Sequence, residues 1–285
     1  GSKTKYSTSQ LLNYSRDSYF ERTSRPVYAI FFLLPFIIFY ELGTIFINTD
    51  MLSLSQVRVV SFVWLQQFLS SIGFSVRFSW MAPPLAVIII LLGLQLASRK
   101  RWYFSLRDVF PMAFECVLYA IPLIVFGLLL NSSSASQQER ALFSGDGLSI
   151  CAQVSEAVAA PGRSVLAEIV TGIGAGIYEE LVFRLVLICI LMIIFQNVLR
   201  FEHRRSIIFS VIVSAVLFSA HHHIVFLNGQ LSQSEPFVLA KFVFRTIAGV
   251  YFAVLFAVRG FGITAGTHAF YDIIAVIVNA VFFHG

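Results

Sequence analysis

Two adjacent carboxylates and an arginine lie inside an otherwise apolar stretch, residues 172–184, which reads Gly-Ile-Gly-Ala-Gly-Ile-Tyr-Glu-Glu-Leu-Val-Phe-Arg. A charged side chain at the centre of a bilayer costs at least ~2.5–3.5 kcal/mol on insertion scales, so such a cluster indicates a functional site. Glu180 and Arg184 are four residues apart and can form an ion pair on one helix face. Glu179 points roughly 100° away from Glu180. It is therefore the carboxylate available for chemistry.

Two further apolar segments carry side chains of catalytic type. Residues 218–223 read Phe-Ser-Ala-His-His-His, and residues 266–272 read Gly-Thr-His-Ala-Phe-Tyr-Asp. His268 and Asp272 are four residues apart, so on a helix Asp272 can orient His268 or join it in a site. Each feature alone is compatible with ordinary packing. Together, a free glutamate, a histidine and a His/Asp pair on three helices are the groups that activate water and stabilise an oxyanion.

The whole chain is expected to be an integral membrane protein. Of its 285 residues, 58% are hydrophobic and 12% are charged, whereas soluble domains carry about 25% charged residues. Long apolar runs without a period of two predict membrane helices, and hence an all-α fold, rather than a barrel. The net charge is +5, and the basic residues lie in short loops between the apolar runs. They are interpreted as a topology signal, so nucleic acid is not expected as a partner. The three cysteines suggest neither a disulfide framework nor a metal site.

The apolar runs predict seven spans, and the segment 56–73 is predicted to be an amphipathic helix at the interface. The expected spans cover residues 26–48, 82–98, 109–130, 164–199, 206–223, 236–258 and 262–283. Lys and Arg gather in alternate loops, so the N-terminus is expected in the cytoplasm and the C-terminus on the opposite side. The expected division is a polar basic segment at 1–25, N-terminal membrane helices with a loop at 26–163, and a membrane core at 164–283.

Straight, parallel spans would place two candidate histidines at different depths. At ~1.5 Å per residue, His222 would lie ~24 Å above the cytoplasmic start of its span, and His268 only ~9 Å above the start of the last span. The two histidines meet only if the connection at 259–264 dips into the bundle or if the span limits differ from these.

The polar motifs resemble the three ordered signatures of the CAAX-protease and bacteriocin-processing family of intramembrane endopeptidases. The motifs are Glu179-Glu180-x-x-x-Arg184, Phe218-x-x-x-His222 and His268-x-x-x-Asp272. The resemblance covers roughly residues 164–283 and implies eight or so membrane helices around a polar cavity. It also implies hydrolysis of a peptide bond by a glutamate-type protease that needs no cofactor.

Carried over by position, the resemblance implies that Glu179 and His222 activate the attacking water. His268 and the residue four places later would stabilise the oxyanion. Glu180 and Arg184 would provide structural support. The expected partners are the lipid bilayer and a protein or peptide substrate, with lipidated proteins among the candidates. A multi-pass location in the bacterial inner membrane is expected.

The last motif raises one alternative to this interpretation, and two further classes of membrane protein remain as rivals. The family pattern ends in Asn or Asp, and the carboxylate of Asp272 would repel an oxyanion unless Asp272 is protonated, orients His268 or binds a metal. A zinc-dependent protease with His222, His268 and Asp272 as ligands is therefore one alternative. A non-catalytic immunity or scaffold membrane protein is a second. A proton-relaying transporter is a third, although the chain shows no half-chain repeat.

Overall fold

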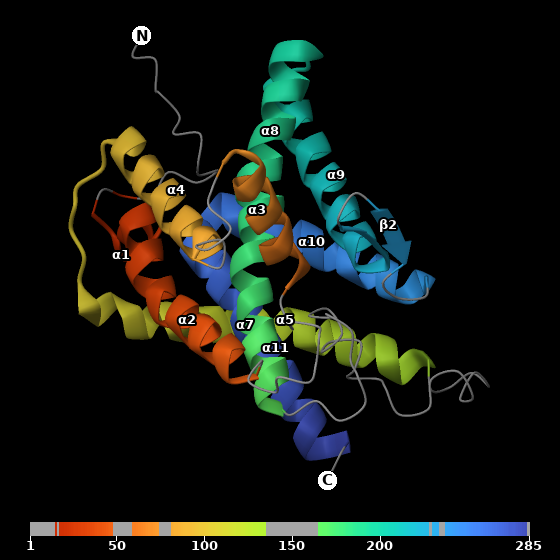
Figure 1. The fold of residues 1–285 in the computed structure, drawn as a ribbon. Helices are drawn as coiled ribbons and strands as arrows, with labels where there is room; N and C mark the ends of the chain where they lie inside the picture. The colour runs from red at the N-terminus through yellow and green to blue at the C-terminus, as the bar shows by residue number, and fades with distance from the viewer. Residues whose placement is uncertain are drawn as a thin grey trace.

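The chain folds into a bundle of long helices that cross at steep angles (Figure 1). The structure is a computed structural model that describes residue 15 and residues 17–47, 59–73, 81–134, 165–227, 230–233 and 237–283. Most of the N-terminal segment 1–25, and nearly all of the loop expected between 131 and 163, lie outside the described residues.

Six helices of the described chain are long and apolar enough to cross a membrane. The N-terminal elements are α1 (Tyr19–Thr23), α2 (Pro26–Ile47), α3 (Val60–Ser71), α4 (Ala82–Ser98), the 3-10 turn η2 (Leu106–Asp108) and α5 (Val109–Ser134). The C-terminal elements are α7 (Val165–Glu180), the π-helical η4 (Leu181–Leu187), α8 (Ile188–Ile193), the π-helical η5 (Ile194–Val198), α9 (His203–His223), β1 (Ile224–Leu227), β2 (Gln230–Gln233), α10 (Leu239–Arg259) and α11 (Phe261–Phe283). The shorter apolar helix α4 has 17 residues, the lower end of the bilayer-spanning range of about 17–25. The protein is therefore a polytopic helical membrane bundle, as its composition predicts.

The segment 56–73 contains α3, a helix of 12 residues. At ~1.5 Å per residue such a helix is about 18 Å long, which is too short to cross a bilayer. However, α3 also reaches the interior. Phe62 is fully buried, with its ring centroid 4.9 Å from that of Tyr178 on α7. The ring of Trp64 lies 5.7 Å from that of His221, so α3 covers the histidine end of α9.

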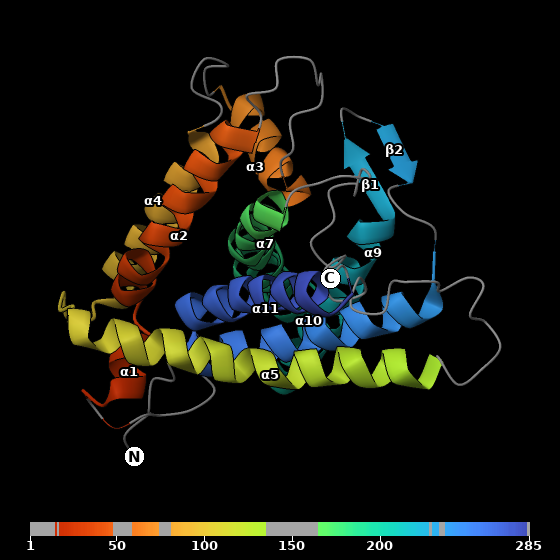
Figure 2. The same cartoon turned by 90° about the horizontal axis from the view of Figure 1, so that it is seen from below.

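α7 and α11 cross with their backbones in close contact, because glycines occupy the crossing positions of α7. A Cβ atom added at Gly176 would lie 2.5 Å from the backbone nitrogen of Ala269, and one added at Gly172 would lie 2.6 Å from Cβ of Asp272. Figure 2 looks almost along α7, whereas α5, α10 and α11 run across the view. The small residues before the glutamate pair therefore serve close helix packing.

The steep crossing brings together histidines that straight, parallel spans would separate. α10 ends at Arg259 and α11 begins at Phe261, so most of the expected connection at 259–264 is helical. Only Gly260 intervenes, with a positive φ of 79° that favours glycine. The ring of Phe218 on α9 lies 5.4 Å from the ring of His222 and 6.1 Å from that of His268.

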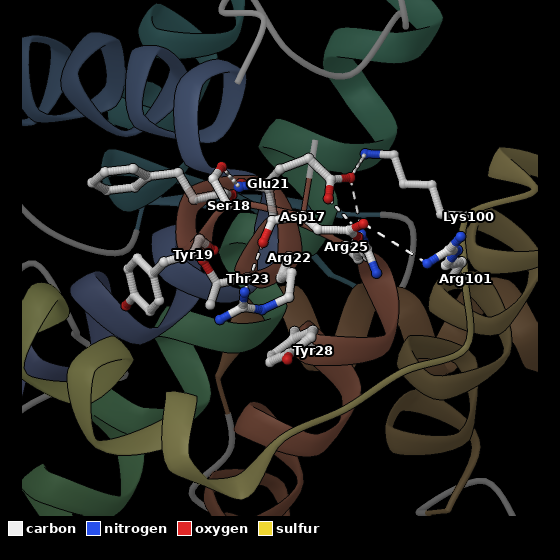
Figure 3. Close-up of polar contacts among 12 residues, drawn as sticks. Asp17, Ser18, Tyr19, Glu21, Arg22, Thr23, Arg25, Tyr28, Lys100 and Arg101 are labelled. Carbon is white, nitrogen blue, oxygen red and sulfur yellow. Dashed lines mark hydrogen bonds and ion pairs between the residues drawn. The ribbon is translucent and has the colours of Figure 1, made fainter. Parts of the chain in front are cut away.

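Basic residues near the N-terminus and after α4, read from the sequence as a topology signal, form ion pairs (Figure 3). Arg25 contacts Asp17 at 2.8 Å and Glu21 at 2.5 Å. Lys100 lies 3.6 Å from Glu21, and Arg101 lies 3.8 Å from Asp17. These pairs fasten α1 to the segment that follows α4.

A second ionic group joins α1 to the end of α10. Arg259 is buried and donates from Nη2 to Glu115 of α5 at 2.8 Å and to Thr23 Oγ1 at 2.9 Å. Tyr19 donates its hydroxyl to the same glutamate at 2.9 Å. Glu115, one of the acids in the apolar runs, is therefore paired within the bundle, as buried charges require.

A two-stranded antiparallel hairpin follows α9 without a break. Its register pairs Ile224 with Gln233 and Leu227 with Gln230. The two residues between the strands are Asn228 and Gly229, a dipeptide favoured in two-residue hairpin loops. In Figure 2, β1 is the strand nearer to α3 and α7, and β2 is the outer strand. The apolar runs of the sequence did not predict these strands.

Candidate active site

Glu180 lies at the last position of α7 and contacts two other motif residues. Its Oε2 is 3.1 Å from Nε of Arg184, and both side chains are fully buried. Its Oε1 accepts a hydrogen bond of 2.8 Å from Nδ1 of His268 on α11. The ion pair is the one that the i,i+4 spacing predicts. The bond to His268 depends on the crossing of α7 and α11, and the sequence did not predict it.

Aromatic rings enclose the Arg184 guanidinium. Its central carbon lies 4.1 Å from the ring centroid of Phe218 and 5.7 Å from that of Phe252. Phe252 also stacks on the imidazole of His268, at 4.6 Å between centroids and 16° between planes. Cation–π attraction of this kind is stronger away from water, so the rings hold Arg184 and His268 in fixed orientations.

Glu179 faces a different group, the histidines at the end of α9. Its Oε1 is 3.5 Å from Nε2 of His221. One ligand-type atom from each of Glu179, His221 and His222 lies within 4.8 Å of the other two, and all three side chains are buried. The adjacent glutamates therefore serve different partners, with Glu180 bonded to α11 and Glu179 directed at α9.

The protonation of His221 follows from its backbone contact. Nδ1 of His221 is hydrogen-bonded to the carbonyl oxygen of Phe218. A carbonyl only accepts, so Nδ1 carries a hydrogen and Nε2 of the neutral ring carries a lone pair. This lone pair faces the Glu179 carboxylate across 3.5 Å. A donor such as a water molecule, or a cation, placed between these two groups would contact both of them.

Asp272 lies one turn after His268, beside the α7–α11 crossing. Its Oδ2 is 3.6 Å from Nε2 of His268, and both side chains are fully buried. The distance exceeds that of a hydrogen bond, whereas the bond from His268 to Glu180 measures 2.8 Å. Glu180 rather than Asp272 therefore fixes the orientation of the His268 ring.

Several buried polar atoms of this region have no hydrogen-bond partner among the described residues. They are Glu179 Oε2, His222 Nε2, His268 Nε2 and both carboxylate oxygens of Asp272. Native proteins leave few buried polar groups unsatisfied, and those that occur call for an explanation such as catalysis or bound water. The atoms come from α7, α9 and α11, so hydrogen-bonding capacity is left unused where these three helices meet.

The structure gathers the sequence-predicted residues into two groups. Glu179 and His222 lie together with His221, and His268 lies with Glu180, Arg184 and Asp272. His222, His268 and Asp272, the ligands of the zinc alternative, are not among the groups of the described residues whose ligand atoms lie within 4.8 Å of one another.

His221 is the member of the site that sequence reasoning passed over. It precedes the motif histidine in a run of three, and its contacts with Glu179 and Phe218 arise from α9. The signal available in the sequence was the run itself, because residues 221–223 supply three imidazoles at the end of one apolar helix.

The comparisons with known proteins bear on these motifs. Residues 161–274 match the model of the family described as Type II CAAX prenyl endopeptidase Rce1-like. The C-terminal part of the chain therefore resembles this family. The match begins just before α7 and ends two residues after Asp272, so it includes every motif residue described above. A comparison with the curated proteins found no match, and neither did a comparison with the solved structures. The match supports a protease, and the six long apolar helices are those of a multi-pass membrane protein.

Proposed function

We propose that this protein hydrolyses a peptide bond of a membrane-associated or lipidated protein within the membrane, with Glu179 as the base that activates water. The observation that carries the proposal is the buried group of Glu179, His221 and His222. Two of its polar atoms have no hydrogen-bond partner among the described residues, and the rings of His222 and His268 both lie near Phe218. Polar atoms buried in this way call for an explanation, and catalysis is one that also fits the family match. Prenylated C-terminal segments are the first substrates to test, since the family description names them.

Water activation is the role proposed for Glu179 and His222. Oε2 of Glu179 and Nε2 of His222 are both buried and have no hydrogen-bond partner among the described residues, and a water molecule bonded to both would be held and polarised. As the water oxygen attacks the scissile carbonyl carbon, Glu179 takes up its proton. Glu179 then returns the proton to the amide nitrogen as the carbon–nitrogen bond breaks, which regenerates the carboxylate.

Oxyanion stabilisation is the role proposed for His268. With Nδ1 donating to Glu180, a protonated ring directs a second N–H from Nε2 toward the site. A donor fixed in this way by its other ring nitrogen stabilises the tetrahedral intermediate without reorganisation. Asp272 assists only in its neutral form, because a carboxylate 3.6 Å from Nε2 competes with the oxyanion for the same proton.

A metal-dependent version of the same reaction is the second candidate. Glu179, His221 and His222 supply one oxygen and two nitrogens, and catalytic zinc sites use three protein ligands and an open position. The bond from His221 Nδ1 to a carbonyl is also the outer contact typical of metal-binding histidines. A bound zinc ion would lower the pKa of its water ligand toward neutrality.

The test of the proposal is cleavage of a synthetic S-farnesylated CAAX-type peptide by purified protein in detergent or lipid vesicles. Glu179→Gln is expected to lower kcat by roughly 10²- to 10⁴-fold, the usual contribution of a general base. Glu168→Gln, which changes another acid on α7 three turns away, is the matched control and should retain activity. Wild-type rates in Glu179→Gln would overturn the assignment.

Chelation separates the two modes of water activation. The metal-free mechanism predicts unchanged rates after incubation with o-phenanthroline and no stoichiometric metal in the purified protein. Loss of activity that Zn²⁺ restores, together with one bound ion per chain, would instead establish the metal-dependent mechanism. His221→Ala should then abolish metal binding.

A further inference from the structure

The hairpin β1–β2 begins where the histidine cluster ends. α9 ends at His223, and β1 starts at the next residue, Ile224. Two peptide units separate Ile224 from His222. Because consecutive Cα atoms are 3.80 Å apart, the Cα atoms of these two residues lie within about 8 Å of each other. The first residue of β1 is thus close to the group that is proposed to activate water.

Each strand of the hairpin has one edge that pairs with the other strand and one outer edge. Within the described residues, the sheet has two strands. Bonded and non-bonded pairs alternate along an antiparallel ladder, so every second residue of β1 directs its N–H and C=O away from β2. Unpaired edges of this kind bind extended chains, and specific peptide complexes use them.

We propose that the outer edge of β1 binds the substrate by strand addition, so that an extended peptide runs beside residues 224–227 and presents its scissile bond to Glu179 and His222. The inference rests on the proposed function and adds how the substrate is held. A strand paired with β1 lies about 4.8 Å from it, which keeps the bound peptide within side-chain reach of the cluster.

The physical setting favours this mode of binding. Where water is scarce, an extended peptide has few partners for its backbone groups, and an unsatisfied group is costly. A two-stranded hairpin is also only marginally stable in isolation, and a third strand stabilises it. The edge of β1 rather than that of β2 is assigned because β1 follows the cluster directly and is the strand nearer α3 and α7 (Figure 2).

The first test is a scan of backbone N-methylation along the farnesylated peptide, on the N-terminal side of the cleaved bond. Strand addition requires peptide N–H groups at alternate positions only. Methylation is therefore expected to lower kcat/KM by about three- to ten-fold at every second residue, the loss of roughly one hydrogen bond, with little change between. Equal effects at all positions, or none, would overturn the proposal while leaving proteolysis intact.

The second test is a matched pair of protein variants, Phe226→Pro and Leu231→Pro. These residues face each other across the hairpin, so proline disturbs the ladder similarly at either position. Only Phe226→Pro alters the edge assigned to the substrate, and it is expected to lower kcat/KM by a further three- to ten-fold relative to Leu231→Pro. Equal kcat/KM values for the two variants would contradict the proposal.

Photo-cross-linking of bound peptide tests the β1 edge independently of peptide cleavage. A photoreactive benzophenone amino acid is placed at position 226 or at position 231 in the Glu179→Gln background, and the farnesylated peptide is added. Cross-linking at 226 well above that at 231 supports the β1 edge even if no peptide is cleaved. Cross-linking that is equal at both positions, or that joins two copies of the chain, would refute it.

Discussion

The buried pair of Glu180 and Arg184 offers a test of how this site tolerates charge in an apolar interior. Both side chains are fully buried and 3.1 Å apart. Removing one member of a buried ion pair leaves the other charge uncompensated, which typically destabilises a protein by about 3–5 kcal/mol. Glu180→Gln keeps an acceptor for His268 but strands the Arg184 guanidinium, so its free energy of unfolding is expected to fall by about that amount.

The reverse change, Arg184→Met, leaves a partly compensated charge. Glu180 retains its hydrogen bond from His268, and methionine fills much of the volume between the rings of Phe218 and Phe252. We therefore expect a smaller loss, about 2–3 kcal/mol, including the lost cation–π attraction to Phe218. The double variant Glu180→Gln with Arg184→Met carries neither charge and should be more stable than Glu180→Gln alone, because well-packed neutral groups often replace buried ion pairs at little cost.

The assay is equilibrium unfolding in mixed detergent micelles, with the four proteins compared as a double-mutant cycle. The expected coupling energy is several kcal/mol, so that the losses of the two single variants do not add. Additive effects would refute the reasoning, as would a loss below about 1 kcal/mol in Glu180→Gln, the range of an exposed ion pair. The same outcome would mean that water reaches the pair.

Three further predictions concern packing, the last motif and pH. Gly176→Ala should destabilise the bundle by about 1–3 kcal/mol in thermal unfolding, because the added Cβ would meet backbone atoms of α11. Gly93→Ala is the control and should not destabilise it, because a Cβ there meets nothing within 4 Å. Asp272→Asn should retain peptide cleavage, because an uncharged amide can donate a hydrogen bond to an oxyanion. Asp272→Ala should lower kcat by roughly 10²- to 10³-fold. Equal rates in the two variants would exclude a donor role for residue 272. Burial alone raises the pKa of Glu21, but the hydrogen bond and charge of Arg25 and the charge of Lys100 outweigh it and hold the pKa below its usual value of 4.5. At pH 7 the free energy of unfolding should therefore be larger for the wild type than for Glu21→Gln. This difference should disappear as the pH falls below 4.5 and passes through the lowered pKa. A difference that persists in acid would exclude the ion pair as its cause.

Local spacing carried much of the prediction from sequence. The i,i+4 rule gave the pair of Glu180 and Arg184, and the same rule placed His268 and Asp272 on one face of α11. Apolar run lengths gave the positions of α2, α4, α5 and the four long C-terminal helices to within a few residues. These features depend on contacts between near neighbours, which the periodicity of a helix fixes in advance.

Features that depend on crossing angles could not be predicted in this way. The depth conflict between His222 and His268 assumed parallel spans, whereas in the crossed bundle the rings of both histidines lie near that of Phe218. The hairpin after α9 was not predicted, because four-residue strands give too short a pattern. His221 was passed over for the same kind of reason, since its role depends on which face of α9 meets Glu179.

The sequence by itself determined that this is a helical membrane protein with three polar motifs, because this follows from composition. It also determined that Glu180, not Glu179, pairs with Arg184, because that contact follows from spacing along a single helix. Only the tertiary structure decided that Glu180 also holds His268 and that Glu179 faces His221 and His222. Those contacts join helices far apart in the chain, and they depend on how α7 crosses α9 and α11, which no local pattern encodes. At α11 the crossing is close because Gly176 lets the two backbones touch.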